Sequence, residues 1–398
     1  MEIRILREEI LNPLQKVQPL IEKRSTMPIL SHVLLDAKEN SLDIFATDLL
    51  LAFKGTCKPI ISQPGKIVVH AKALYEIIRN LNCEEIYLRE NENQWLEIKG
   101  GNSFFSLASL PVEEFPSFPE IGHFNLVFIS GELLNKAITK TYFSMAKEEL
   151  DTHLAGLCCE KIDKKLRFVS TDRFRLTYME IPFEDIEILQ FEKNIMIPKK
   201  AVLEILRLNP RETLEIGFDN SAGVIKIPPS PAVSAPARPA GGDRQAGENG
   251  DLLYIRLMEN RFPQYQHIIP EKNEYEAKIP KAPLKDILRR MNILVDEKNK
   301  VADFLFTKDK LTLFLDNPEM GKAQETLEIE VVPGRNLTKE MKFIFNISYL
   351  LDILNVLDSE IFIFGLNTAE KTPCVITGEN DPGFKAFIVP IMEKKEDE

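Results

Sequence analysis

The chain has few of the residues that build metal centres and disulfide frameworks. Its 398 residues include five cysteines, none at CxxC spacing, and five histidines that are scattered singly. An odd number of cysteines in this arrangement indicates reduced thiols in a cytosolic protein, rather than a zinc site or a set of disulfides. We therefore expect no metal and no cofactor.

Long apolar runs are also missing. No stretch approaches eighteen uninterrupted apolar residues, and the N-terminal "MEIRILREEI" lacks the apolar centre of a signal peptide. The apolar fraction of 44% and the charged fraction of 28% are typical of a globular protein, and the length suggests two or three domains. We expect a cytoplasmic protein that does not bind membranes.

Similar segments recur along the chain at nearly constant spacing. "EILNPL" from Glu9 returns 123 residues later as "ELLNKA" from Glu132. "FATD", ending at Asp48, returns 124 residues later as "VSTD", ending at Asp172. A helical pattern at 74–81 returns at 202–209 and at 350–357, and "FLDNP" places Asp316 as the third equivalent of Asp48. Three copies of a unit of about 120 residues would account for nearly the whole chain.

A segment of unusual composition interrupts the second copy. Phe115-Pro116 returns as Phe262-Pro263 after 147 residues, which is 23 more than the 124 found for the aspartates. Residues 228–250 have that length, and 14 of them are proline, alanine or glycine. Such a segment cannot bury apolar surface, so we expect a disordered loop that lengthens a hairpin between "VIKI" (224–227) and "LLYIRL" (252–257).

Each copy contains two helical patterns and several short strands separated by Asn, Gly, Asp and Pro. We expect an α+β fold of three repeated domains, each with two helices packed on antiparallel sheets. The expected domains are 1–123, 124–272 with the insertion 228–250, and 273–398 with a charged tail at 393–398.

Positive charge gathers on the predicted helices, although the chain as a whole carries a net charge of −11. In a helix expected from Glu132 to about Lys147, Lys136, Lys140 and Lys147 fall on one face. Leu134, Ile138 and Met145 fall on the opposite face. Lysines on one such face can simply keep the helix solvated. Because the pattern recurs across the units, we favour a surface that binds nucleic-acid phosphates without reading the base sequence. The candidate DNA-facing residues are Arg24, Lys72, Arg79, Lys136, Lys140, Lys147, Lys199, Lys200, Arg207, Lys285 and Arg289.

Motifs of common enzymes are missing: we find no P-loop, no GxGxxG after a strand, no HExxH and no GxSxG. Two interpretations of Asp48 and Asp172 remain. They could bind a divalent metal in an enzyme that processes nucleic acids. Alternatively, each Thr-Asp pair ends its strand by accepting hydrogen bonds from nearby backbone amides. We favour the turn, because the two aspartates occupy equivalent places in separate repeats.

Seven segments, in order, make the sequence resemble the β sliding clamps of bacterial DNA polymerase III over almost its full length. They are "RSTMPILSHVLL" (24–35), "FATDL" (45–49), "FSMAKEE" (143–149), "VSTDRFRL" (169–176), "RFPQYQHIIP" (261–270), "FNISYLLDIL" (345–354) and "FIVPIM" (387–392).

The resemblance implies a head-to-tail homodimer that forms a ring around duplex DNA, without sequence preference and without catalysis. Such a clamp gives processivity by tethering the replicative polymerase, and it also binds the clamp loader, other polymerases and repair proteins. A clamp-like paralogue outside replication is a further possibility. Phe105 and Leu107 of the first domain would meet Ile293 and Leu294 of the third across the dimer contact.

The resemblance also implies that partners insert a short peptide, with a Gln and apolar residues, into a pocket between the second and third domains. Many family members have a small residue where this chain has Arg173, and some have Arg where it has His267. The implied pocket residues are Leu154, Thr171, Arg173, Phe174, Arg175, Leu176, Pro263, His267, Ile268, Asn346, Tyr349, Pro373, Cys374, Phe387, Val389, Ile391 and Met392.

Overall fold

The computed structural model describes residues 1–21, 27–147, 153–228, 250–259, 261–296, 300–332, 340–369 and 372–391. The chain forms two compact units. The first unit comprises Met1–Asn135, Glu187–Glu192 and Leu203–Met258. The second comprises Lys136–Ile186, Lys193–Val202 and Glu259–Glu398.

The first unit contains two antiparallel sheets. In spatial order, the five-stranded sheet consists of β5 (Ile60–Gln63), β1 (Glu2–Leu6), β7 (Glu85–Glu90), β8 (Leu96–Gly100) and β9 (Ser103–Leu107). The nine-stranded sheet consists of β10 (Ser109–Leu110), β6 (Gly65–His70), β2 (His32–Ala37), β3 (Leu42–Thr47), β4 (Leu51–Cys57), β18 (Asp251–Arg256), β17 (Ala222–Ile227), β16 (Thr213–Phe218) and β11 (Val127–Ser130).

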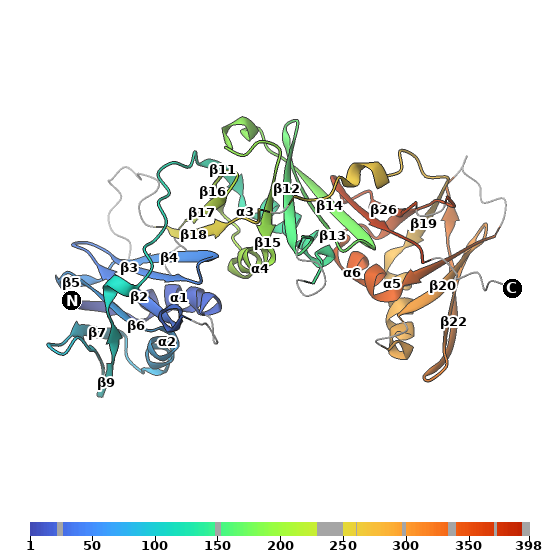
Figure 1. Ribbon diagram of the computed structural model, residues 1–398. Coiled ribbons are helices and arrows are strands. Elements are labelled where there is room, and N and C mark those ends of the chain that lie inside the picture. Colours follow the sequence, from blue (N-terminus) through green and yellow to red (C-terminus); the bar gives the residue numbers. More distant parts are fainter. Residues whose placement is uncertain are drawn as a thin grey trace, which may run out of the picture. The chain divides into compact units, whose positions relative to one another are not determined.

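Helices α1 (Arg7–Val17) and α2 (Ala71–Asn80) lie side by side in this unit (Figure 1). Ile10 and Leu14 of α1, one turn apart, join Leu74 and Ile78 of α2 in a core with residues of both sheets. All four side chains are fully buried. Removing such a side chain from water stabilises a fold by about 1.5–3 kcal/mol. The i, i+4 spacing therefore fixes which face of each helix is packed.

The second unit also contains two antiparallel sheets. The nine-stranded sheet consists of β15 (Asn194–Pro198), β12 (Gly156–Ile162), β13 (Lys165–Thr171), β14 (Arg175–Pro182), β27 (Phe384–Ile388), β26 (Cys374–Gly378), β25 (Ile361–Leu366), β19 (Tyr275–Pro280) and β23 (Glu330–Val331). The four-stranded sheet consists of β22 (Gly321–Glu328), β21 (Lys310–Asn317), β20 (Val301–Phe306) and β24 (Met341–Asn346).

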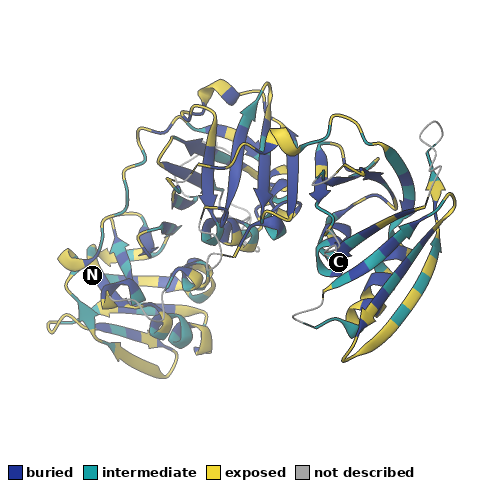
Figure 2. Ribbon diagram, turned by 45° about the vertical axis from the view of Figure 1, so that its right-hand side comes forward, coloured by how far each residue is buried: buried dark blue, intermediate teal, exposed yellow. Residues whose placement is uncertain are grey.

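Helices α5 (Lys281–Met291) and α6 (Ile347–Val356) pack together in the second unit. The apolar residues of α5 follow the i, i+3, i+4, i+7 pattern, and the predicted apolar side is the buried one. Figure 2 shows buried residues concentrated along the strands and on one side of the helices. The buried residues of α5 are Leu284, Ile287, Leu288 and Met291.

The remaining helices are shorter or contribute to both units. Residues of α3 (Gly131–Thr139) and α4 (Lys199–Leu208) belong to both. Seven 3-10 helices complete the described part of the chain: η1 (Gln18–Leu20), η2 (Pro28–Ser31), η3 (Val112–Glu114), η4 (Tyr142–Ser144), η5 (Ile186–Ile188), η6 (Tyr265–Ile268) and η7 (Asn292–Leu294).

Most elements confirm the sequence-based expectation of an α+β fold. The predicted hairpin is present: β17 pairs with β18, and Ile227 lies opposite Asp251 at its end. Of the predicted insertion 228–250, only Pro228 and Gly250 are described. The tail at 393–398 lies outside the described residues. The domain limits of the three repeats stay a prediction.

One predicted helix is wrong in length. The pattern suggested a helix from Glu132 to about Lys147, whereas α3 ends at Thr139 and is followed by η4. The segment after α3 contains Thr141, Tyr142 and Phe143, β-branched or aromatic residues that are poor helix formers. Thr141 is also held by its hydroxyl, which donates to the Ala137 carbonyl at 2.7 Å.

The third repeat also needs a correction of one residue. The spacing pointed to Asp316 as the equivalent of Asp48 and Asp172. The turn is instead made by Asn317, whose Oδ1 accepts hydrogen bonds from the amides of Glu319 and Met320. Asp316 forms an ion pair with Lys322 at 2.5 Å.

No helix among the described residues is both long enough and apolar enough to span a lipid bilayer.

Candidate functional site

A tight turn joins β13 to β14 at the stretch "VSTDRFRL". The Thr171 hydroxyl donates to the Arg175 carbonyl at 2.7 Å and accepts from the Arg173 amide at 3.2 Å. The Asp172 Oδ1 accepts from the amides of Phe174 and Arg175 at 3.1 and 3.0 Å. Both side chains are therefore occupied in shaping the backbone, as the turn interpretation predicted.

The same turn joins β3 to β4 in the first unit. Thr47 donates to the Leu51 carbonyl at 2.8 Å, and the Asp48 Oδ1 accepts from the amides of Leu50 and Leu51 at 2.9 and 2.6 Å. The residue after the aspartate has a positive φ in both turns, 72° at Leu49 and 78° at Arg173. Asp48 and Asp172 thus have the same structural role in two repeats.

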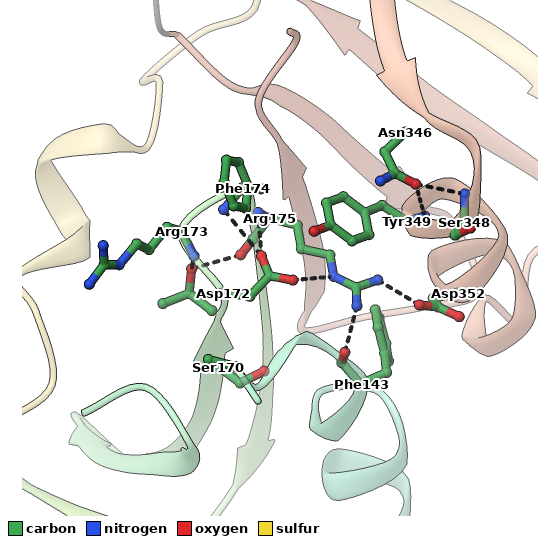
Figure 3. Close-up of polar contacts among 12 residues, drawn as sticks. Phe143, Ser170, Asp172, Arg173, Phe174, Arg175, Asn346, Ser348, Tyr349 and Asp352 are labelled. Carbon is green, nitrogen blue, oxygen red and sulfur yellow. Dashed lines mark hydrogen bonds and ion pairs between the residues drawn. The ribbon is translucent and has the colours of Figure 1, made fainter. Parts of the chain in front are cut away.

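Arg175 connects the turn to helix α6. Its Nε donates to Asp172 at 3.0 Å, one terminal nitrogen donates to Asp352 at 2.7 Å, and the other donates to the Phe143 carbonyl at 2.8 Å (Figure 3). The guanidinium also lies 4.2 Å from the centre of the Tyr349 ring. Since Arg175 is only 8% exposed, these contacts hold it as a fixed support for the aromatic ring.

Tyr349 is positioned from its own helix as well. The Asn346 side chain caps α6 by accepting from the amides of Ser348 and Tyr349 at 2.9 and 3.3 Å (Figure 3). Burial, and then the nearby Asp172 carboxylate, raise the pKa of the Tyr349 phenol. The phenol is therefore neutral near pH 7 and can donate a hydrogen bond.

A pocket of about 600 Å³ opens at this place in the second unit. Phe174, 58% exposed, and Tyr349 belong to its lining. A concave site with aromatic walls and a few fixed polar groups is typical of a site that binds a small ligand or the side chains of a peptide. Its lining residues are Phe143, Met145, Ala146, Lys147, Asp172, Arg173, Phe174, Arg175, Lys199, Lys300, Asn346, Ser348 and Tyr349.

Five of the predicted pocket residues line this pocket: Arg173, Phe174, Arg175, Asn346 and Tyr349.

Other predicted pocket residues lie on or next to the neighbouring strands and η6. The Val389 amide donates to the Phe174 carbonyl at 3.0 Å, and the Ile391 amide donates to the Ile344 carbonyl at 2.8 Å. Ile268 is 50% exposed, and the His267 Nε2 lies 3.4 Å from the Gln264 side-chain oxygen. Pro263 is exposed as well. Met392 lies outside the described residues. Leu154, Thr171, Leu176, Pro373, Cys374 and Phe387 are buried.

Sequence reasoning missed several lining residues. Phe143, Met145 and Ala146 fell within a segment quoted for the family resemblance, but Met145 was assigned to the apolar face of an overlong helix. Lys147 and Lys199 were assigned to DNA alone. Nothing in the local pattern singled out Lys300, which lines the pocket and whose carbonyl accepts the Ile347 amide at 2.9 Å.

Lys140 is a wrong prediction. It is only 2% exposed, and its ammonium forms an ion pair with Asp381 and donates to the Val356 carbonyl at 2.8 Å. A buried lysine with these partners does not present its charge to DNA. Asp381 is fixed by further donors, the amide and the hydroxyl of Ser359 at 2.9 and 2.6 Å.

Several predicted DNA-facing residues have acidic neighbours. Lys136 lies 2.8 Å from Asp358, and Arg79 lies 3.5 Å from Glu76. Exposed pairs of this kind are weak, so both cations can still exchange partners with phosphate. Arg207 forms an ion pair with Glu204 and donates to the Lys16 carbonyl at 2.7 Å.

The other predicted cations lie on helices or next to them. Lys72 is exposed on α2, and Arg289 is exposed on α5, 3.6 Å from Asp286. Partial burial, and then the charges of Arg289 and Lys281, lower the pKa of Lys285. Lys200 is half-buried in α4. Arg24 lies outside the described residues.

The predicted dimer residues are accessible on the two units. Phe105 is 41% exposed and Leu107 is half-buried on β9, which is an edge strand of its sheet. Ile293 is 71% exposed on η7, directly after α5, and Leu294 is half-buried beside it.

Within the described residues, no three His, Cys, Asp or Glu side chains come together as a group that could hold a metal ion.

Models of one protein family match three successive segments of the chain. The DNA polymerase III beta subunit N-terminal domain matches residues 1–119, the central domain matches 128–227 and the C-terminal domain matches 266–392. The chain belongs to the DNA polymerase III beta subunit family. Members of this family are sliding clamps of DNA replication and not enzymes, and the chain is a clamp of this kind, built from three clamp domains.

Individual relatives agree with this family. The beta sliding clamp of Pseudomonas aeruginosa is 29% identical, over 98% of this chain and 100% of its own length. That of Escherichia coli is 28% identical, over 90% and 91%. Among solved structures, the DNA polymerase III subunit beta from P. aeruginosa has a TM-score of 0.86 at 25% identity, covering 99% of this chain and 100% of its own. The sliding clamp from Bartonella birtlesii, bound to griselimycin, has a TM-score of 0.86 at 26% identity and the same coverage.

Family membership and the turn geometry together remove the metal-enzyme hypothesis. Asp48 and Asp172 accept backbone amides in matching turns within a family of clamps. The two aspartates looked like a catalytic pair only because the same turn occurs once in each of two repeats.

Proposed function

We propose that two copies of this chain form a head-to-tail ring around duplex DNA and that partner proteins bind the pocket beside Phe174. The observation that carries the proposal is the pocket of the second unit, where Arg175 supports Tyr349 next to the exposed Phe174 ring. The family models, which cover all three repeats, support the clamp role.

The proposed DNA contacts are electrostatic and independent of base sequence. The accessible cations on or near the helices that would contact DNA include Lys72, Lys136 and Arg289. Lys140 is not among them, because it is buried. Since the chain has a net charge of −11, phosphates would be repelled from most of its surface and attracted to these positions. Weak contacts of this kind allow a ring to slide.

The proposed partners are proteins that carry a short linear peptide with a Gln and apolar residues. They include the replicative polymerase, the clamp loader, other polymerases and repair proteins, all acting in the cytoplasm. Such a peptide would place its apolar anchors against Phe174 and Tyr349, and buried anchors provide most of the binding energy in interfaces of this type.

The dimer contact would join the edge strand β9 with the region of η7. Phe105 and Leu107 would meet Ile293 and Leu294 of a second copy, and the same contact would be made twice, so that the ring closes.

The test compares how well the protein is retained on circular DNA and on linear DNA. The chain is loaded by its own clamp loader onto a nicked circular plasmid, and one half of the sample is then linearised. Gel filtration should show the protein retained on the circle and lost from free linear ends, because a ring is held by topology. Equal retention on both forms, or dissociation from both at the same rate, would contradict the encircling function.

A further inference from the structure

Lys140, directly after α3, fixes the C-terminal end of helix α6. Its ammonium donates to the carbonyl of Val356, the last residue of α6, at 2.8 Å. A cation at this position also interacts favourably with the partial negative charge of the helix end. The same ammonium lies 3.2 Å from the Asp358 carboxylate and forms an ion pair with Asp381. One lysine therefore holds the end of a helix that lies 216 residues away in the chain.

Asp381, the buried partner of Lys140, is itself held in place. Its carboxylate accepts the amides of Asp358 and Ser359, each at 2.9 Å, and the Ser359 hydroxyl at 2.6 Å. Asp381 and Lys140 are each only 2% exposed, so solvent and salt screen their ion pair little. The ammonium thus has fixed partners on the side of α6.

The chain that follows Lys140 is bound to the nine-stranded sheet. The Thr141 carbonyl accepts the hydroxyls of Ser170 on β13 and Thr177 on β14, the latter at 3.3 Å. Because the main chain next to Lys140 is fixed on the sheet, its contact with Val356 fixes α6 relative to the sheet.

A second contact joins the same two segments near the pocket. Arg175 donates to the Phe143 carbonyl at 2.8 Å and to Asp352 of α6 at 2.7 Å (Figure 3). Phe143 lies three residues after Lys140, and Asp352 lies four residues before Val356. The segment from Lys140 to Phe143 is therefore joined to α6 at two levels, about one helical turn apart.

The pocket uses the same side of α6. Tyr349 and Asp352 are three residues apart and Val356 follows four residues later, so all three lie along one side of the helix. Tyr349 lines the pocket from α6, and Phe143 lines it from η4. The two walls that carry these rings belong to the two joined segments, and their spacing depends on the contacts between them.

We propose that Lys140 and Asp381 are positioning residues for partner binding. Their buried ion pair keeps α6 and the segment from Lys140 to Phe143 at the spacing that a partner peptide requires. The inference rests on the proposed function, because it explains how the peptide pocket is held in shape. Neither Lys140 nor Asp381 is among the described residues that line the pocket. Val356 lies seven residues, about 10 Å along the helix, beyond Tyr349.

Loosening this contact should act on the rate of association. If α6 moves relative to η4, only a fraction of the molecules has correctly spaced walls, and the apparent affinity falls by that fraction. The complex, once formed, keeps all its direct contacts, so its dissociation rate should change little. Removing a side chain that touches the peptide has the opposite result, because lost contacts mainly raise the dissociation rate.

The test uses stopped-flow fluorescence anisotropy with the full chain and a short fluorescein-labelled peptide in which a Gln is followed by leucine and phenylalanine. Lys140→Met should lower the association rate constant about three- to ten-fold, as found for mutations that act on a site through the packing around it. The dissociation rate constant should change by less than about two-fold. Asp381→Asn should have the same effect, and the double variant should be no worse than the more affected single variant, because both remove one contact.

Lys164→Met is the matched control. Lys164 forms an exposed ion pair with Glu184 at 2.8 Å in the same unit, away from the pocket lining. This variant also loses one lysine and one ion pair, and both rate constants should stay unchanged.

Circular dichroism checks that each variant is folded. If Lys140→Met does not fold, Ser359→Ala, which removes one donor to Asp381, must lower the association rate about two-fold. An unchanged association rate, or a rise of the dissociation rate alone, overturns the inference. If wild type binds and Tyr349→Ala raises the dissociation rate while Lys140→Met changes nothing, only the positioning role is wrong. If wild type does not bind the peptide, the proposed function and the inference both fail.

Discussion

Arg173 has a backbone conformation that suits glycine better than arginine. Its φ of 78° lies in the left-handed region, which costs a residue with a Cβ about 1–2 kcal/mol. The turn tolerates it because Thr171 and Asp172 hold the adjacent amides. Strain of this kind is often kept where a side chain has a task, and Arg173 lines the pocket.

Arg173→Gly should therefore be more stable to unfolding than Arg173→Ala by about 1 kcal/mol. Both variants lose the side chain, but only alanine keeps the Cβ that is strained at positive φ. Chemical denaturation monitored by circular dichroism measures the difference. The same pair at Leu49, with φ of 72°, is the control for a turn outside the pocket and should show a similar gap. Equal stabilities at both positions would contradict the assignment of strain.

The ion pair between Lys140 and Asp381 should dominate stability in its region. Asp381→Asn removes the buried charge partner of Lys140, which keeps only the more exposed Asp358 at 3.2 Å. This variant should reduce the free energy of unfolding by about 3 kcal/mol. Lys140→Met should cost less, because Asp381 keeps donors from Ser359 and from the Asp358 amide at 2.9 Å. Denaturant titration compares the two variants. A larger loss for Lys140→Met would show that the carboxylate, rather than the lysine, depends on this contact.

The same pair makes the stability depend on pH. Burial alone would raise the pKa of Asp381, but donors from Lys140, Ser359 and Asp358 hold the pKa below its usual value. A carboxyl whose folded pKa is lowered contributes stability that is full above its unfolded pKa of about 3.9. That contribution is lost as the pH falls through the folded pKa. Between pH 5 and 3, wild type should lose more stability than Lys140→Met, which lacks one of the donors; parallel losses would argue against this role.

At the residue scale, sequence alone predicted the turns but not the partners. Thr171 and Asp172 were assigned correctly because Asx hydrogen bonds are local. In the third repeat, the turn was predicted at Asp316 but is formed by the next residue, Asn317. The error arose because aspartate and asparagine side chains can form the same turn. Lys140 could not be assigned, because Asp381 lies 241 residues away in the chain.

Among the elements, helices with a strong apolar period were predicted best. The i, i+3, i+4, i+7 pattern of α5 identified its buried face correctly. The end of α3 was missed because the prediction followed the helical period alone. That period continues beyond Thr139, where the residues have low helix propensity. Lys147 was placed on a helix for the same reason, whereas it lines the pocket.

The hairpin of β17 and β18 allows a test of whether the insertion contributes to stability, because the insertion can be replaced by a short turn. Replacing residues 228–250 by Asn-Gly would join Ile227 to Asp251, which already lie opposite each other. Stability should stay the same or rise by up to about 2 kcal/mol, because a shorter loop loses less entropy on closure. Thermal unfolding measures the effect. A large loss would show that residues of the insertion contribute contacts to the fold.

For the whole molecule, the repeat could be inferred from the sequence, whereas the detailed site depended on long-range packing. The pocket joins η4, the 171–175 turn, the start of α4, Lys300 and α6. No spacing rule relates these segments, and only the family resemblance connected some of them beforehand.

Ring formation should depend on one edge of the five-stranded sheet and not on the other. Phe105→Glu, on the edge strand β9, should convert the dimer to a monomer by burying a charge in the proposed contact. Ile60→Glu is the matched control, because Ile60 is 66% exposed on β5, the opposite edge strand. Light scattering coupled to size exclusion gives the mass. If both variants stay dimeric, or both become monomeric, β9 is not the specific contact.

The adjoining ends of β17 and β18 also offer a practical use. Because Ile227 and Asp251 face each other across the hairpin, a segment inserted between them would begin and end at nearly the same point. A fluorescent domain whose own termini are close together can be placed there, as such insertions succeed at exposed loops between paired strands. Both chain ends would remain native, and a clamp could then be followed on single DNA molecules by a label carried within its second repeat.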